Sequence, residues 1–109
     1  MMAVSISQLQ EETRVSVEGD LDLTSVPAFR AAVDEALGTR EKRRLVVDLR
    51  QTSYIDSAGL EQLLAANRKL AAQGDRLTVR VLPGSQPQTV LGVVGFGTIM
   101  DVEPATGAE

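Results

Sequence analysis

The 109-residue sequence contains no cysteine and no histidine. Without cysteine the chain has no disulfide, no thiol nucleophile and no cysteine zinc site. Without histidine it has no Ser-His-Asp triad and no histidine metal ligand. Most familiar hydrolytic chemistry is therefore excluded.

The sequence also lacks a long hydrophobic segment. Its longest apolar stretch, TVLGVVGFGTIM from Thr89, is interrupted by glycines and is too short to span a bilayer. The first residues lack the basic start and the long apolar core of a signal peptide. We therefore expect a cytoplasmic protein with no membrane insertion.

Positive charge is sparse: the sequence has 11 Lys and Arg and 15 Asp and Glu, which gives a net charge of −4. Phosphate contacts need clustered cations, so direct nucleic-acid binding is disfavoured. One dense basic group, Arg40 with Lys42, Arg43 and Arg44, is typical of a solvated turn before a strand, with a partner-binding patch as the alternative.

The composition that remains is that of a globular chain, with 43% hydrophobic and 24% charged residues. We expect one domain over residues 1–109, with a small, polar tail that frays from about residue 103. The sequence alone leaves the oligomeric state open.

The first forty residues predict a β-hairpin followed by a helix. Apolar residues alternate on either side of a short polar link, at Val4, Ile6, Leu9, Val15 and Val17. Helical spacing follows at Val26, Phe29, Val33, Ala36 and Leu37. Thr24 or Ser25 can cap this helix, and Gly38 suits a left-handed position at its end.

The middle of the chain predicts a βαβ unit over residues 44–82. RLVVDL from Arg44 has the composition of a buried strand, and RQTSYID then forms a loop. A helix follows with an apolar stripe at Leu60, Leu63, Leu64, Leu70 and Ala71, ended by Gly74. RLTVRVL from Arg76 predicts a strand parallel to the first.

The last third predicts a short helix in SQPQTVLGVVG, with Val90, Leu91 and Val94 inward and Phe96 and Ile99 returning to the core. The predicted fold class is therefore α/β, a mixed sheet of four or five strands that begins with a hairpin and is covered by helices. The order of the strands is not predictable from these patterns.

Function in such sheets gathers where strands meet helices, and SYIDSAGL is the most informative junction. If Asp56 caps the second helix, Ser57 lies in its first turn, where free N–H groups favour an added negative charge. Alternatively, Ser57 is itself the cap. Gly59 in this turn indicates either the close approach of a ligand or backbone, or tight packing on a strand.

The other junction, GDLDLTS, places Asp20 and Asp22 on either side of Leu21. Paired carboxylates can bind a hard cation, yet they are also ordinary turn and capping residues. GVVGFG from Gly92 does not have the spacing or context of a dinucleotide-binding loop.

Three segments together resemble STAS domains, specifically the stand-alone bacterial anti-sigma factor antagonists. They are GDLDLTSVPAFRAAVDEAL, RLVVDLRQTSYIDSAGLEQLL and PQTVLGVVGFGTIMDV, and the strand followed by IDSAGL is the most specific. The run GFGTIM departs from the more charged stretch usual in the family.

The resemblance implies a partner switch in which Ser57 is phosphorylated. The unmodified protein would bind an anti-sigma factor that is also a serine kinase, releasing a sigma factor, and a PP2C-type phosphatase would reset it. The implied partner-binding residues are Asp22, Thr24, Asp56, Ser57, Ala58 and Gly59. No catalytic residue, metal or cofactor is implied.

Two other hypotheses are open at this point. In one the same fold serves as an accessory subunit of a lipid-transporting ABC system or as a scaffold in a signalling assembly. In the other it is a small metal-dependent enzyme that works through Asp20, Asp22 and Asp56.

Overall fold

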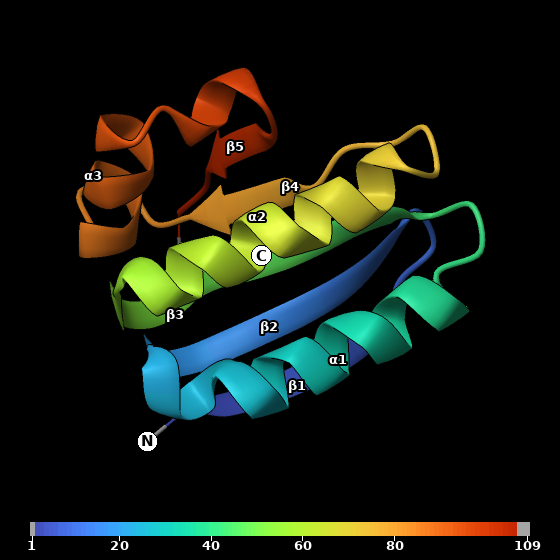
Figure 1. Ribbon diagram of the computed structural model, residues 1–109, viewed down its shortest axis with the longest axis horizontal. Helices are drawn as coiled ribbons and strands as arrows, with labels where there is room; N and C mark the ends of the chain where they lie inside the picture. The colour runs from blue at the N-terminus through green and yellow to red at the C-terminus, as the bar shows by residue number, and fades with distance from the viewer. Residues whose placement is uncertain (1, 107–109) are drawn as a thin grey trace.

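The alternating residues at the start of the chain form a hairpin, and the rest adds three helices and three further strands. The computed structural model describes residues 2–106. Its elements are β1 (Ala3–Gln8), β2 (Glu12–Leu21), the 3-10 turn η1 (Leu23–Ser25), α1 (Val26–Thr39), β3 (Arg44–Ile55), α2 (Ser57–Ala71), β4 (Thr78–Val81), α3 (Gln86–Val93), the 3-10 turn η2 (Phe96–Thr98) and β5 (Asp101–Pro104) (Figure 1).

The strands lie in the order β1-β2-β3-β4-β5. β1 and β2 are antiparallel, whereas β2, β3, β4 and β5 run parallel. The α/β fold, the hairpin and the βαβ unit are thus confirmed, with five strands in the sheet. Because β2 and β3 are parallel, their carboxyl ends lie at the same end of the sheet, and GDLDLTS and SYIDSAGL lie there together.

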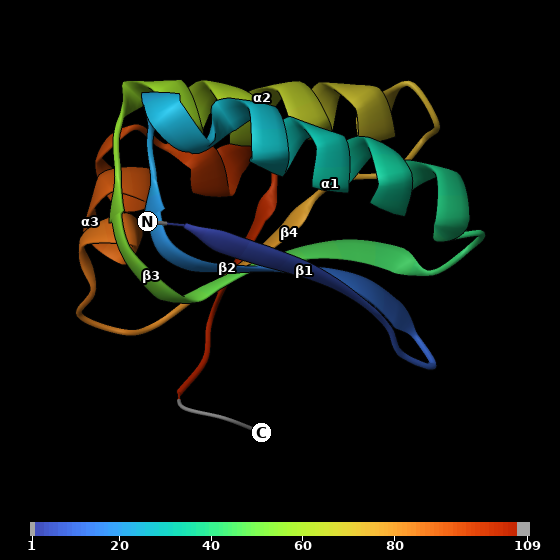
Figure 2. The same ribbon diagram turned by 90° about the horizontal axis from the view of Figure 1, so that it is seen from below.

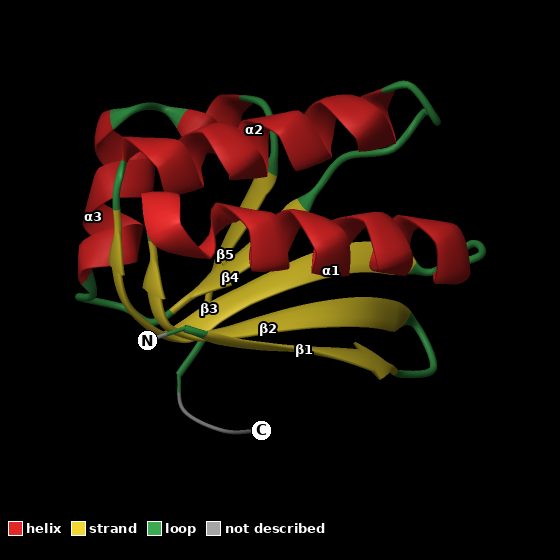
Figure 3. Cartoon of the chain, turned by 60° about the horizontal axis from the view of Figure 1, so that its bottom comes forward, coloured by secondary structure: helices red, strands yellow, loops and turns green. Residues whose placement is uncertain are grey.

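Helices α1 and α2 cover one face of the sheet, and the other face carries no helix of the described chain (Figures 2 and 3). The core lies between these two layers. Its largest fully buried side chains include Phe29 of α1, Leu63 and Leu70 of α2, and Leu45 and Leu49 of β3. α3 lies beside the end of the sheet where α2 begins (Figure 2).

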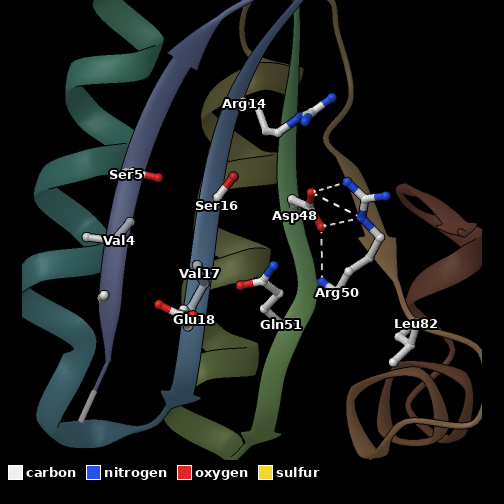
Figure 4. Close-up of a pocket in the computed structure, with 11 residues that line it drawn as sticks. Val4, Ser5, Arg14, Ser16, Val17, Glu18, Asp48, Arg50, Gln51 and Leu82 are labelled. Atoms are coloured by element: carbon white, nitrogen blue, oxygen red, sulfur yellow. Dashed lines mark hydrogen bonds and ion pairs between the residues drawn. The ribbon is translucent and has the colours of Figure 1, made fainter. Parts of the chain in front are cut away.

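The helix-free face is polar and held by ion pairs. Glu12 of β2 contacts Arg80 of β4 and Arg14 of its own strand, with N–O distances of 3.1 and 2.7 Å. Asp48 and Arg50 of β3 form a second pair at 2.8 Å, which Figure 4 shows. This face is therefore covered by paired charged side chains and not by helices.

β3 is longer than predicted. Residues 50–55, expected as a loop, continue the strand because β2 extends beside them as far as Leu21, with register shifts after Ser16 and Gly19. These irregularities break the alternating pattern, which hid the strand in the sequence.

The end of the chain also differs from prediction. Residues 103 and 104 belong to β5, which pairs with β4, so the expected start of the frayed tail is wrong for these two residues. Residues 107–109 of that tail lie outside the described part. Met100 is the buried residue before β5, whereas Ile99 is 43% exposed and does not return to the core.

Four smaller expectations at element ends are wrong. Gly38 lies inside α1, and the left-handed residue after this helix is Glu41, with φ 57°. Leu9 and Val94 are exposed, and Ala71 is exposed on the last turn of α2.

Arg40 is buried rather than solvated. It donates to Asp75 (2.9 Å), to the Gln73 amide oxygen (2.7 Å) and to the Arg43 carbonyl (2.8 Å). It therefore ties the end of α1 to the turn after α2.

Candidate functional site

Asp56 caps α2, and Ser57 is the first residue of that helix. The Asp56 carboxylate accepts a hydrogen bond from the Gly59 N–H at 3.0 Å, with the extended backbone usual at an N-cap. Ser57 is exposed, and within residues 2–106 its hydroxyl has no hydrogen-bond partner. The alternative in which Ser57 is the cap is therefore wrong.

Gly59 is buried against the end of β2. A Cβ atom on this residue would lie 2.5 Å from the Leu21 carbonyl oxygen and 2.7 Å from the Ile55 side chain. The structure thus supports tight packing as the reason for this glycine. Its contribution to the site is to let the N-terminus of α2 approach β2 closely.

The loop after β2 is organised by Asp22, which caps η1. Its carboxylate accepts hydrogen bonds from the Thr24 hydroxyl at 2.7 Å and the Thr24 N–H at 3.1 Å. These bonds, the hydroxyl bond above all, lower the pKa of Asp22. Asp22 is therefore ionised near neutral pH. The buried Ser25 completes the turn, since its hydroxyl accepts from the Asp22 N–H at 2.9 Å.

A direct contact joins the two loops. The second oxygen of the Asp56 carboxylate accepts from the Leu23 N–H at 3.3 Å, and the Asp56 N–H donates to the Leu21 carbonyl at 3.3 Å. One side chain thus caps α2 and holds η1 beside it. Five residues named from the sequence thus lie side by side: Asp22 and Thr24 in the η1 turn, and Asp56, Ser57 and Ala58 at the start of α2.

Leu23 was missed by sequence reasoning. Its side chain is 71% exposed in the turn that Asp56 holds. An exposed leucine among polar residues is a feature of interaction surfaces. The available signal was that Leu23 lies between two capping residues and outside the apolar stripe of the next helix.

Gln86 was also missed, and it fixes the junction from the other side. Its amide oxygen accepts from the Ile55 N–H at 2.9 Å, and its amide nitrogen donates to the Ile55 carbonyl at 3.0 Å. Since β4 pairs with β3 at Val46, Val47 and Asp48, the end of β3 has no strand neighbour on that side among the described residues. The Gln86 side chain takes the place of one.

The Asp20 side chain lies exposed at the end of β2, and this residue joins the hydrogen-bonded group only through its backbone carbonyl, which accepts from the Ser25 hydroxyl at 3.1 Å. Across residues 2–106, no cluster of three or more acidic side chains is arranged to hold a metal ion. Asp20, Asp22 and Asp56 therefore do not form the metal site that the enzyme hypothesis requires.

The helix-free face has a shallow hollow of about 590 Å³ between β1, β2 and β3 (Figure 4). Its cationic residues, Arg14 and Arg50, are engaged with Glu12 and Asp48. The hollow therefore offers no uncommitted positive charge to an anionic ligand. None of the helices in the described range is long and apolar enough to cross a bilayer.

The fold matches solved structures over nearly its whole length. An anti-sigma factor antagonist from Mycobacterium paratuberculosis aligns with a TM-score of 0.83 at 21% identity, covering 96% of this chain and 87% of that one. The Bacillus cell fate determinant SpoIIAA in its phosphorylated form aligns with a TM-score of 0.68 at 24% identity, covering 95% and 92%. A putative anti-sigma factor antagonist from Thermotoga maritima aligns with a TM-score of 0.80 at 12% identity, covering 94% and 86%.

The family assignment comes from a sequence model. Residues 4–101 match the family described as "Mlab, STAS domain". This range includes every strand and helix except the first residue of β1 and the last three of β5. The chain therefore belongs to the STAS domain family.

Proposed function

We propose that this protein is an anti-sigma factor antagonist whose binding to an anti-sigma factor is controlled by phosphorylation of Ser57. The observation that carries the proposal is an exposed hydroxyl on the first residue of α2, unpartnered within residues 2–106, beside a loop with an exposed leucine. Structural neighbours described as anti-sigma factor antagonists support the same role, and one of them, SpoIIAA, is also solved in its phosphorylated form.

The helix terminus accounts for how the domain tolerates the phosphate. The N–H groups of a first helical turn and the helix dipole stabilise a negative charge. Because the Asp56 carboxylate already caps α2 by accepting from the Gly59 N–H, the phosphate does not have to replace the existing cap. The fold is therefore expected to survive the modification.

The same charge accounts for the loss of binding. A phosphate adds about −1.5 to −2 charges at neutral pH, next to the Asp56 carboxylate and near Asp22, whose lowered pKa keeps it ionised. Reversing a partner choice from 1:99 to 99:1 takes about 5.5 kcal/mol of differential binding. A bulky anion at the centre of an interface can supply energy of this order through repulsion and lost contact.

In this mechanism the protein is a substrate and not an enzyme. The partner would be an anti-sigma factor with serine kinase activity, which binds ATP, transfers its γ-phosphoryl group to the Ser57 hydroxyl and releases ADP. A PP2C-type phosphatase would remove the phosphate. Asp22, Thr24, Asp56 and Ala58 would contact the kinase, together with Leu23.

The proposal is tested by mixing the protein with candidate anti-sigma kinases and ATP and measuring mass and affinity. We expect Ser57→Ala to remain unmodified and to bind permanently, and Ser57→Asp to bind more weakly. Ser53→Ala is a matched control, because Ser53 is also exposed but lies within β3. Equal affinity of the Ser57→Ala and Ser57→Asp variants would contradict the proposal.

Asp22→Ala separates a role in the switch from a role in folding. We expect it to slow phosphorylation more than it lowers the melting temperature, since Asp22 organises only the η1 turn. A large loss of melting temperature with normal phosphate transfer would assign Asp22 to structure. Co-purification with a membrane ATPase, without modification of Ser57, would favour the accessory-subunit or scaffold role instead.

A further inference from the structure

The two edges of the sheet differ in how they are protected against pairing with another strand. The β5 edge is four residues long, carries Asp101 and Glu103, and ends at Pro104. Short length, charge and proline are the usual devices that block edge pairing. The β1 edge, AVSISQ, has no charge and no proline, and it pairs with β2 without a register shift. β1 therefore presents a regular row of backbone donors and acceptors on its outer side.

We propose that β1 pairs with β1 of a second copy of this chain. The two strands would run antiparallel about a two-fold axis perpendicular to the sheet, joining two five-stranded sheets into one. An edge without charge is compatible with itself, because identical residues meet across a two-fold axis and like charges there would repel.

The alternation of β1 restricts how the two copies meet. Val4 and Ile6 are half-buried on the helix side, whereas Ser5 and Ser7 are exposed on the other. Both helical layers must lie on the same face of the joined sheet, so serines can only face residues of the exposed set. Near the middle of the strand this leaves Ser5 opposite either the second copy's Ser5 or its Ser7.

In the joined sheet, the flank of α1 beside this edge would lie next to the same flank of the second copy's α1. Arg30 and Asp34 bond to side chains of α2, so the opposite flank faces β1. Thr39 lies on that flank and accepts from Gln8 of β1 at 2.9 Å. Helical spacing places the exposed residues Ala28, Glu35 and Thr39 on the outer part of this flank, beside the buried Ala32. Mostly small side chains allow two α1 helices to approach to the ~8–10 Å of ordinary helix packing.

This association does not use Ser57 or α2. The antiparallel arrangement directs the two Ser57 hydroxyls toward opposite ends of the joined sheet. The dimer proposal can therefore be wrong while the phosphorylation switch is correct, and the switch can be wrong while the dimer is correct.

The test is the molar mass of the full chain, by light scattering over a range of concentrations. We expect the mass to rise from 11.7 kDa toward twice that value. The double variant Ser5→Lys with Ser7→Lys places lysines opposite each other in either register, so it should stay at the monomer mass. Ser16→Lys with Ser53→Lys adds the same charge to β2 and β3 and should dimerise like the wild type.

A second measurement covers the case in which the lysines disturb the hairpin. Because the chain has no cysteine, Ser5→Cys with Ser7→Cys introduces the only thiols, and oxidation should link two chains by a disulfide. Ser16→Cys, one strand further in, should not crosslink. A wild-type mass that stays at 11.7 kDa at every concentration, or crosslinking of Ser16→Cys as efficient as that at the edge, would overturn the proposal.

Discussion

At the scale of single residues, the site depends on two neighbours in opposite environments. Ser57, the first residue of α2, is exposed, whereas Gly59, two positions later, is packed against the Leu21 carbonyl. The exposed hydroxyl is available to a partner because the glycine lets the helix begin so close to β2. A change at Gly59 is therefore expected to move the helix start and not only to fill space.

Gly59→Ala should destabilise the fold by about 1–3 kcal/mol, the usual cost of overpacking. Its Cβ would lie 2.5 Å from a backbone oxygen that cannot rotate away. Chemical denaturation measures the change. Gly38→Ala is the matched control, because Gly38 lies inside α1 with nothing within 4 Å of the added Cβ. It should be neutral or stabilising by up to ~1 kcal/mol, and equal losses in both variants would contradict the packing argument.

At the scale of elements, three segments converge on the end of β3. β2 pairs with it on one side, α2 continues from it, and α3 reaches it through the Gln86 amide. A strand end that is held on both sides gives the following helix a defined starting point. The position of Ser57 is therefore set by α3 as well as by its own helix.

Gln86→Ala should release this junction. Loss of a hydrogen bond costs about 0.5–1.5 kcal/mol, so amide hydrogen exchange at Ile55 should accelerate by roughly 2- to 13-fold. Exchange measured by NMR reports this directly. Gln88→Ala is the control, since Gln88 bonds to Gly84 in the exposed turn before α3 and not to β3. Unchanged exchange at Ile55 in the Gln86 variant would show that the amide does not hold the strand.

At the scale of the whole molecule, ion pairs span the helix-free face from β2 to β5. Glu12 forms ion pairs with Arg80 and Arg14, and Glu103 forms ion pairs with Arg44 and Arg80. Burial alone would raise the pKa of Glu12, but the hydrogen bonds and charges of Arg80 and Arg14 outweigh it and lower this pKa to about 2. The ionised carboxylate therefore stabilises the folded state.

The stability of the wild type should fall as the pH drops from about 4.5 toward 2. A carboxylate whose pKa is lower in the folded state contributes stability above its unfolded pKa, 4.5, and loses that contribution as the folded pKa is approached. For Glu12 the contribution at neutral pH is on the order of 3 kcal/mol. Urea denaturation across this range should show a steep loss in the wild type and a shallower one in Glu12→Gln.

Glu11→Gln is the control for this titration, because Glu11 is exposed in the hairpin turn and its side chain makes no ion pair within residues 2–106. It should follow the wild-type curve. If the unfolding free energy of Glu12→Gln fell with pH as steeply as that of the wild type, Glu12 would not contribute to the acid sensitivity.

The sequence by itself determined the features that depend on neighbouring residues. Alternation predicted the hairpin, helical spacing predicted α1 and α2, and the order of segments predicted the parallel pair of β3 and β4. The motif IDSAGL located Asp56 and Ser57 at a helix start and suggested the family. Periodicity and capping are properties of short segments, so they can be recognised without knowing the fold.

Only the tertiary structure decided what depends on residues far apart in the chain. The strand at residues 50–55 exists because β2 lies beside it, and β5 exists because β4 offers an edge. Gly59 is explained by Leu21, and the junction at Ile55 is held by Gln86. Each of these contacts joins segments that are distant in the sequence, and no local pattern records which distant group will satisfy a backbone hydrogen bond or fill a space.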